Sequence, residues 1–160
     1  MSVTLRPIRD DELSEWLVGA RVEHAREMAA DAGLDPDEAR GKVGRDLDAL
    51  FPEGRIAEGH AVFIVETDGA RVGSLWVGER PDPVGRPTFF VYDIHIDEGQ
   101  RGRGYGRAAM VAAEAEAARR GVARIALNVF GGNERARSLY RSLGYVERAV
   151  AMDKTLTREL

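Results

Sequence analysis

The sequence predicts one α/β domain over residues 1–160, built on a mixed, mostly antiparallel sheet with helices on both faces. Three observations carry this prediction. The apolar patterns follow one another as strand, two helices, three strands, helix, strand, helix and strand. The 160 residues suit one domain with its own core, and 44% of them are apolar. No internal repeat, low-complexity tract or linker divides the chain.

The first third of the chain predicts one strand and two helices. Residues 2–8 read as a strand, and Asp10 and Asp11 can cap the helix that follows. The second helix begins at Asp35, a good N-cap with Pro36 in the first helical position. The expected buried faces repeat at spacings of three and four: Leu13, Trp16, Leu17, Ala20 and His24 in the first helix, and Ala39, Val43, Leu47 and Leu50 in the second.

The middle of the chain predicts a hairpin and a third strand. Residues 61–79 hold two β-rich runs around an Asp-Gly pair, which is a strong signal for a tight turn. Residues 80–87 are a loop, because three prolines break any regular structure there. Residues 88–96 form the next strand.

The last part of the chain predicts a helix, a strand, a second helix and a final strand. A helix over 104–120 follows a glycine-rich loop, and residues 122–130 form a strand. A short helix capped by Asn133 ends at Gly144, and residues 145–156 form the final strand. The expected inner faces are Ala108, Val111, Ala112, Ala115 and Ala118 in the longer helix, and Ala136, Leu139, Tyr140 and Leu143 in the shorter.

The composition narrows the possible classes of function. A net charge of −4 disfavours a general nucleic-acid-binding protein. The chain has no cysteine, and His24, His60 and His95 match no metal-ligand spacing, so we expect no disulfide and no metal. The early acidic residues are unlike a signal peptide, and no apolar run approaches the roughly 20 residues of a membrane span. We expect a cytoplasmic protein with no nucleic acid and no membrane among its partners.

The stretch RGRGYG, residues 101–106, predicts an anion site between a strand and a helix. The first amides of a helix lack intrahelical partners, and glycines let a phosphate approach them. A dinucleotide fingerprint needs a glycine where Arg107 stands, and a P-loop needs a lysine that this stretch lacks. A solvated turn with surface arginines is the simpler interpretation. The order of strand, loop and helix, with two arginines, favours a ligand that carries phosphates.

Two motifs resemble the GNAT superfamily of acyl-CoA-dependent N-acyltransferases. Arg101, Gly104 and Gly106 match its signature [RQ]-x-x-G-x-[GA], which lies between the fourth strand and the third helix of that family. The run NERARSLYRSLGY, residues 133–145, matches N-x-x-A-x-x-L-Y-x-x-x-G-[FY]. The resemblance covers about residues 3–156. It implies a GNAT-like fold and acetyl transfer from acetyl-CoA to a primary amine, on a small molecule or a protein, by direct attack in a ternary complex.

The resemblance also implies where coenzyme A binds. In the family, the main chain of the fourth strand binds the pantetheine arm, which here corresponds to Ile94 and Ile96. The loop amides bind the pyrophosphate. The residues that correspond to this loop are Arg101, Gly102, Arg103, Gly104, Tyr105, Gly106 and Arg107. Asn133 stands where family members often contact the cofactor, and it serves equally well as a plain helix cap.

The resemblance makes Tyr140 the general acid that protonates the leaving thiolate. The alternative interpretation of Tyr140 is a core aromatic residue on an amphipathic helix. Two family positions for the general base fall on the fourth strand, at Tyr92 and Phe90, and a third falls on the fifth strand, at Asn128. None of these side chains is an obvious base.

Asp93 and His95 are the titratable residues nearest to those positions. In a regular strand they alternate with Tyr92 and therefore point to the opposite face. They remain candidate bases, in direct contact or through water. A water chain, or a residue of the first two helices such as Glu23 or His24, is the other possibility.

The acceptor is left open by the sequence. The resemblance places the acceptor pocket at about residues 10–51 and 79–88, and no carboxylate cluster there points to a polyamine or an aminoglycoside. Candidate pocket residues are Trp16, His24, Tyr92 and Asn128. A non-catalytic acyl-CoA sensor is the alternative function, because no obvious base is present. Family members often pair, which leaves a homodimer open.

Overall fold

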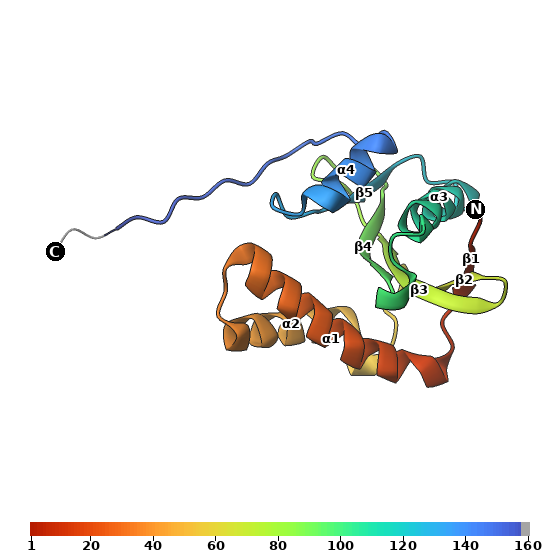
Figure 1. The fold of residues 1–160 in the computed structure, drawn as a ribbon, viewed down its shortest axis with the longest axis horizontal. Helices are drawn as coiled ribbons and strands as arrows, with labels where there is room; N and C mark the ends of the chain where they lie inside the picture. The colour runs from red at the N-terminus through yellow and green to blue at the C-terminus, as the bar shows by residue number, and fades with distance from the viewer. Residues whose placement is uncertain (158–160) are drawn as a thin grey trace. The chain divides into compact units, whose positions relative to one another are not determined.

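The computed structural model describes residues 1–157, and the chain forms two compact units, Met1–Asn128 and Val129–Leu160. The first unit contains, in chain order, β1 (Thr4–Pro7), α1 (Asp10–Ala32), α2 (Pro36–Leu50), the 3-10 turn η1 (Pro52–Gly54), β2 (His60–Thr67), β3 (Ala70–Glu79), β4 (Phe89–Ile96), the 3-10 turn η2 (Glu98–Gln100), α3 (Tyr105–Arg119) and β5 (Ile125–Leu127). The second unit contains α4 (Glu134–Ser142) (Figure 1).

The five strands form one mixed sheet in the order β1-β2-β3-β4-β5. Neighbouring strands are antiparallel, except that β4 and β5 run parallel. The turn between β2 and β3 has positive φ at both central residues, Asp68 and Gly69, as a tight hairpin turn requires. The sheet and its helices confirm the predicted fold class.

Helices α1 and α2 cover one face of the sheet and lie side by side (Figure 1). Their predicted apolar stripes are buried in a core that includes Trp16 and Leu47. The sheet contributes Val62, Ile64 and Trp76 to the same core. Removing such side chains from water stabilises the fold by about 1.5–3 kcal/mol each. The face that carries this core is therefore the one against which α1 is held.

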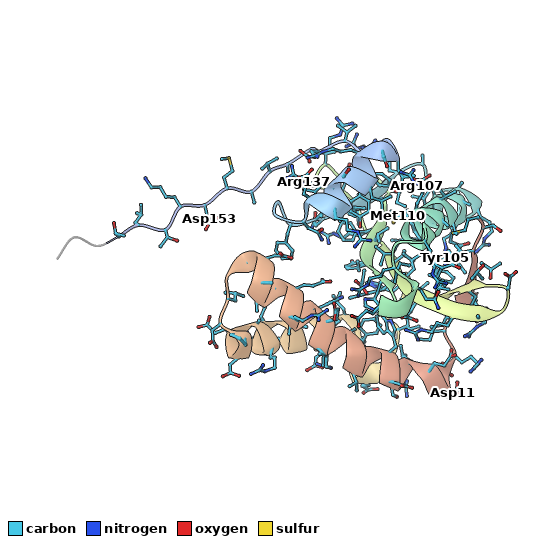
Figure 2. The ribbon with its side chains drawn as sticks, viewed as in Figure 1. Asp11, Tyr105, Arg107, Met110, Arg137 and Asp153 are labelled. Atoms are coloured by element: carbon cyan, nitrogen blue, oxygen red, sulfur yellow. The ribbon has the colours of Figure 1, made fainter. Side chains whose placement is uncertain are left out.

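Helix α3 lies on the opposite face of the sheet. Strand residues adjacent to those of the first core point away from α1, and they are buried too: Phe63, Val65, Leu75, Val77, Phe89 and Val91. Against them α3 buries Ala109, Met110, Ala113 and Ala117 (Met110 in Figure 2). The predicted α3 face was wrong by about one residue, since Val111 is 50% exposed. Small apolar residues run along several sides of this alanine-rich helix, so their spacing did not distinguish the buried side.

The second unit is organised around α4. The Asn133 side chain caps the helix by accepting a hydrogen bond from the amide of Ala136 at 3.2 Å. Arg137 and Arg141 both bind the Glu147 carboxylate, at 2.9 and 2.8 Å, which holds the following chain against the helix.

The predicted strand over 145–156 is wrong, because the described residues 145–157 contain no strand. Val150 and Met152 are 71% and 90% exposed. Strand preference is realised only through pairing with another strand, and none of the described strands pairs with this segment. Over residues 1–157 no helix is long and apolar enough to cross a membrane.

Candidate active site

The glycine loop joins the end of β4 to the first turn of α3. Gly102 and Gly104 have φ of +76° and +85°, where a side chain would add strain. Gly104 is the N-cap of α3 and has no side chain to cap it, so the first amides of the helix are not capped from the N-cap position. Arg101 Nε donates to the carbonyl oxygen of Ile96 at 3.0 Å and so ties the loop to the strand. A helix N-terminus of this kind binds anions.

The remaining predicted loop residues surround these amides. Arg103 and Arg107 are exposed, whereas Tyr105 and Gly106 are partly buried at the start of α3 (Tyr105 and Arg107 in Figure 2). The Arg103 guanidinium lies 3.4 Å from the side-chain oxygen of Gln100. The loop therefore places two cationic side chains at the solvent side of the helix N-terminus.

The second half of β4 has an open edge. Strand β5 pairs only with residues 89–91, so no described strand covers the outer edge of β4 beyond them. The amide of Asp97 donates to the carbonyl of Val72 on β3 at 2.9 Å. Because backbone groups alternate between the two sides of a strand, those of Ile94 and Ile96 point to the open edge. An extended ligand could pair with them as an added strand would.

A β-bulge at Tyr92 changes the face that β4 presents. Val91 pairs with Val77 of β3, but the next pair is Asp93 with Trp76, so Tyr92 has no partner of its own. Residues paired across two strands share a face. Trp76 points toward α1, and Asp93 therefore does so as well.

The prediction that Asp93 and His95 face away from Tyr92 is therefore wrong. Tyr92 stacks on Trp76, with ring centroids 4.6 Å apart, and so lies on the α1 face. Beyond the bulge, Asp93 and His95 lie on the same face, with His95 paired to Ser74. The prediction assumed a regular strand, and one extra residue reversed the alternation.

His24 of α1 lies beside Asp93, with 3.3 Å between Nε2 and Oδ1. Burial by itself lowers the pKa of His24, but the hydrogen bond and charge of Asp93, with Glu27 and Glu23, raise that pKa above the ordinary 6.5. Burial and the charge of Asp93 likewise raise the pKa of Glu27. The core of this site is thus a histidine among three carboxylates.

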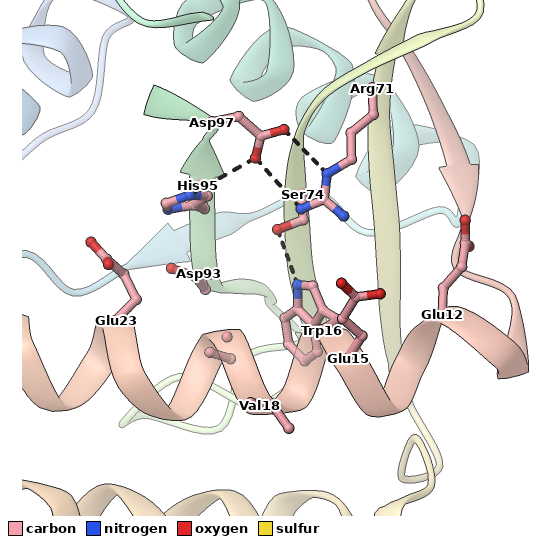
Figure 3. Close-up of a pocket in the computed structure, with 12 residues that line it drawn as sticks. Glu12, Glu15, Trp16, Val18, Glu23, Arg71, Ser74, Asp93, His95 and Asp97 are labelled. Carbon is pink, nitrogen blue, oxygen red and sulfur yellow. Dashed lines mark hydrogen bonds and ion pairs between the residues drawn. The ribbon is translucent and has the colours of Figure 1, made fainter. Parts of the chain in front are cut away.

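A cavity of about 650 Å³ lies between α1 and the sheet, next to this pair. Helix α1 lines it with Glu12, Glu15, Trp16 and Glu23 (Figure 3). The Trp16 indole donates to the buried hydroxyl of Ser74 at 3.0 Å and so fixes α1 against β3. The glutamates lie on one helix stripe at spacings of three, four and four residues, counting Gly19.

The sheet lines the same cavity with Arg71, Asp93, His95 and Asp97. Arg71 Nε donates to the Asp97 carboxylate at 3.2 Å, and His95 Nε2 lies 3.9 Å from that carboxylate (Figure 3). Asp97 therefore shares its charge between two cationic or polar partners. The wall carries several carboxylates and one arginine, which suits a positively charged ligand.

The structure thus brings Trp16, Asp93 and His95 to one cavity, with His24 directly beside it. The sequence did not predict the acidic wall, which is the set of α1 and β4 carboxylates that line this cavity. The carboxylates of residues 10–51 and 79–88 do not form a cluster without those of β4. The stripe of glutamates on the first helix was the available signal.

Three other candidate residues belong to other parts of the chain. Asn128 is exposed at the end of the first unit, directly after β5. Asn133 and Tyr140 belong to the second unit, at the N-cap and in the second turn of α4. Within residues 1–157, no group of three or more His, Asp or Glu side chains is arranged to hold a metal ion.

A mixed sheet whose fourth strand opens at its edge and leads through a glycine loop into a helix defines a class of acyltransferases. Residues 25–145 match the acetyltransferase (GNAT) family, so the chain belongs to that family. This confirms the resemblance found in the two motifs. GNAT N-acetyltransferases depend in general on acetyl-CoA.

Known relatives agree with this assignment. YycN of Bacillus subtilis, named an uncharacterized N-acetyltransferase, is 28% identical over 157 residues, which are 98% of this chain and 100% of that protein. The crystal structure of YycN gives a TM-score of 0.89 over the same shares of the two chains. A mycothiol acetyltransferase of Beutenbergia cavernae is 41% identical over 83 residues, 52% of this chain and 27% of that protein.

A more distant solved structure shows the same fold. The aminoglycoside N-acetyltransferase AAC(6′)-Iy in complex with CoA has a TM-score of 0.61 at 21% identity, over 96% of this chain and 95% of that one.

Proposed function

We propose that this protein transfers the acetyl group of acetyl-CoA to a primary amine by direct attack in a ternary complex. One observation carries the proposal. The backbone groups of Ile94 and the amide of Ile96 face an open strand edge, and the chain then leads through the glycine loop to the N-terminus of α3. An extended amide-bearing arm that ends in phosphates matches both halves of this surface.

The proposed coenzyme site divides into two parts. The edge of β4 at Ile94 and Ile96 would pair with the pantetheine arm, and the amides and arginines of residues 101–107 would bind the pyrophosphate. Asn133 is a further proposed contact, which rests on its match to the family motif. The amide of Ile94 would stabilise the negative charge that develops on the acetyl oxygen.

The proposed chemistry needs an acid and a base. The amine must lose a proton to form the new bond, and the thiolate leaves more readily when it gains one. Tyr140 is the proposed acid, because it stands at the tyrosine of the family motif. Asp93 and His95 are the proposed bases, and both line the cavity. Trp16 and Tyr92 are proposed to shape the acceptor side of the site.

Calorimetric titration with acetyl-CoA tests the proposed coenzyme site. We expect the unmodified protein to bind and Gly104→Glu to lose at least about tenfold in affinity, or about 1.4 kcal/mol. A glutamate there strains a φ of +85° and puts a negative charge beside the phosphates. Gly69→Glu is the matched control, because Gly69 also has positive φ and open space but lies in the β2–β3 turn.

Turnover tests the reaction itself. The protein is assayed for release of CoA thiol with spermidine, lysine methyl ester, glucosamine, an aminoglycoside and a peptide with a free N-terminus. Initial rates at varied concentrations of both substrates should give intersecting lines, as a ternary complex requires. Binding of acetyl-CoA without turnover of any amine would favour the sensor over the enzyme. An absence of acetyl-CoA binding would refute both functions.

A further inference from the structure

The β-bulge at Tyr92 creates a contact that the sequence does not predict. It turns Asp93 toward α1, where His24 meets it with 3.3 Å between Nε2 and Oδ1. The side chains of His24 and Asp93 are 20% and 17% exposed, so neither is sealed from a ligand. Asp93 lines the cavity, and His24 stands behind it on α1.

The surroundings of His24 hold its ring in place. The imidazole lies parallel to the Trp76 indole, with an interplanar angle of 11° and 6.4 Å between centroids. The charged groups that act on it are Asp93 from β4, and Glu23 and Glu27 from α1. All three are carboxylates, and each favours the protonated imidazole.

We propose that Asp93 and His24 together accept the proton that the acceptor amine loses. This inference rests on the proposed acetyl transfer and names its base. Asp93 is the group that touches the amine, because it is the member of the pair that lines the cavity. His24 acts through Asp93 as the group on which the proton comes to rest.

The proton and electron movements balance. The amine gives one proton to the Asp93 carboxylate, which passes it to Nε2 of the neutral His24. Imidazole holds a proton more strongly than a carboxylate does, so the pair ends as imidazolium and carboxylate. The nitrogen electron pair forms the C–N bond to the acetyl carbon, and the C–S bond breaks with its electrons on sulfur. The thiolate takes a proton from the proposed acid, and the imidazolium releases its proton to water.

His95, the other candidate, is less suited to this step. Its Nε2 lies 3.9 Å from Asp97, compared with 3.3 Å in the pair of His24 and Asp93. Asp97 is also engaged by the guanidinium of Arg71, with 3.2 Å between Nε and Oδ2. The pair of His24 and Asp93 is therefore the closer of the two histidine–carboxylate contacts, and it is assigned as the base.

An NMR titration of the histidines measures the effect of Asp93 on His24 without any substrate. The chain has three histidines, so each imidazole can be assigned by single replacement. We expect His24 to titrate above the ordinary imidazole value and to fall in Asp93→Asn, where burial acts without the carboxylate. Asp46→Asn, in an exposed ion pair with Lys42, is the matched carboxylate control and should leave His24 unchanged.

The acetyl-transfer rate in a single turnover links this titration to chemistry. Protein preloaded with acetyl-CoA is mixed with the fastest amine of the panel between pH 5.5 and 9. A base must be unprotonated, so the rate should fall as pH drops through the pKa of His24. We expect Asp93→Asn to slow the step by about 10²-fold or more. In His24→Gln the acid limb set by His24 should disappear.

Matched variants separate this role from a structural one. His60→Gln removes the other histidine that contacts Trp76. Within the described residues, His60 accepts a hydrogen bond from the Trp76 indole and has no carboxylate partner. That variant should keep the acid limb. Calorimetric binding of acetyl-CoA, measured for every variant, shows whether the coenzyme site is intact, so a wrong assignment of the base can be distinguished from a failure to bind acetyl-CoA.

The NMR titration and the single-turnover rates together decide whether His24 and Asp93 form the base. A His24 pKa that falls in Asp93→Asn, with loss of the acid limb in His24→Gln, supports the pair as base. Two results overturn it: a His24 that titrates below the ordinary value in the unmodified protein, which needs no variant, or an acid limb that survives His24→Gln in a variant that still binds acetyl-CoA.

Discussion

Replacing Gly73 by alanine tests how closely β3 and β4 approach beside the proposed coenzyme site. A Cβ built at Gly73 would lie 2.1 Å from the backbone oxygen of His95 and 3.1 Å from Cα of Ile96, whereas real Cβ contacts are essentially never below 3.0 Å. Relief requires β4 to move by about 0.9 Å at its paired residues, and backbone atoms cannot rotate away as a side chain can.

The magnitude follows from two costs. Overpacking costs about 1–3 kcal/mol, and each ladder hydrogen bond that is weakened costs about 0.5–1.5 kcal/mol. We therefore expect Gly73→Ala to lower the free energy of unfolding by about 2–4 kcal/mol, and the melting temperature by about 5–15 °C. The same movement displaces Ile94 and Ile96, so acetyl-CoA affinity should fall in the protein that remains folded.

Urea unfolding followed by circular dichroism measures this loss, and Gly19→Ala provides the control. Gly19 is exposed on α1 with open space around it, so alanine should stabilise the helix by about 0.5–1 kcal/mol. Replacing glycine by alanine is therefore expected to lower the free energy of unfolding at Gly73 and to raise it at Gly19. A Gly73→Ala protein within 0.5 kcal/mol of the unmodified protein would refute the close approach of β3 and β4.

Two further outcomes follow from named contacts. Trp16→Phe removes the indole donor and leaves the Ser74 hydroxyl buried without it, so the free energy of unfolding measured by urea titration should fall by about 1–3 kcal/mol. The double variant Trp16→Phe with Ser74→Ala should lose less stability than Trp16→Phe alone. An equal or greater loss of stability in the double variant would contradict this account. Hydrogen bonds from Arg6 and the Arg9 amide lower the pKa of Glu12 from 4.5 to about 2. Its stabilising contribution is therefore complete above pH 4.5 and lost as pH falls toward 2. Glu12→Gln should be less stable at pH 7 and converge on the unmodified protein near pH 2; a constant difference would contradict this.

The elements of the fold were largely predictable from local patterns. The first two helices bury the predicted stripe from Leu13 to Ala20 and the stripe that contains Leu47, because large apolar residues there recur on one side only. Asp35 caps α2 because its carboxylate accepts hydrogen bonds from the amides of Asp37 and Glu38. The buried face of the alanine-rich helix α3 was not predicted correctly, because the sides of this helix are chemically alike.

The prediction of a final strand was wrong for a different reason. Residues 145–156 have the composition of a strand, but a strand exists only where a neighbouring edge accepts its hydrogen bonds. Local preference at Val150 or Met152 carries no information about that edge.

The sequence by itself determined the family and pointed to the proposed anion-binding end of the site. Arg101, Gly104 and Gly106 are contiguous in the chain, and a loop followed by a helix brings its amides together through local geometry alone. Only the tertiary structure decided the acceptor side. Whether Asp93 faces His24 depends on one bulged residue in the pairing of β4 with β3 and on where α1 crosses the sheet, which brings together residues some 70 positions apart in the chain. A one-residue change in register reverses a face without altering any local preference, which is why the contact between Asp93 and His24 could be recognised only in the folded protein.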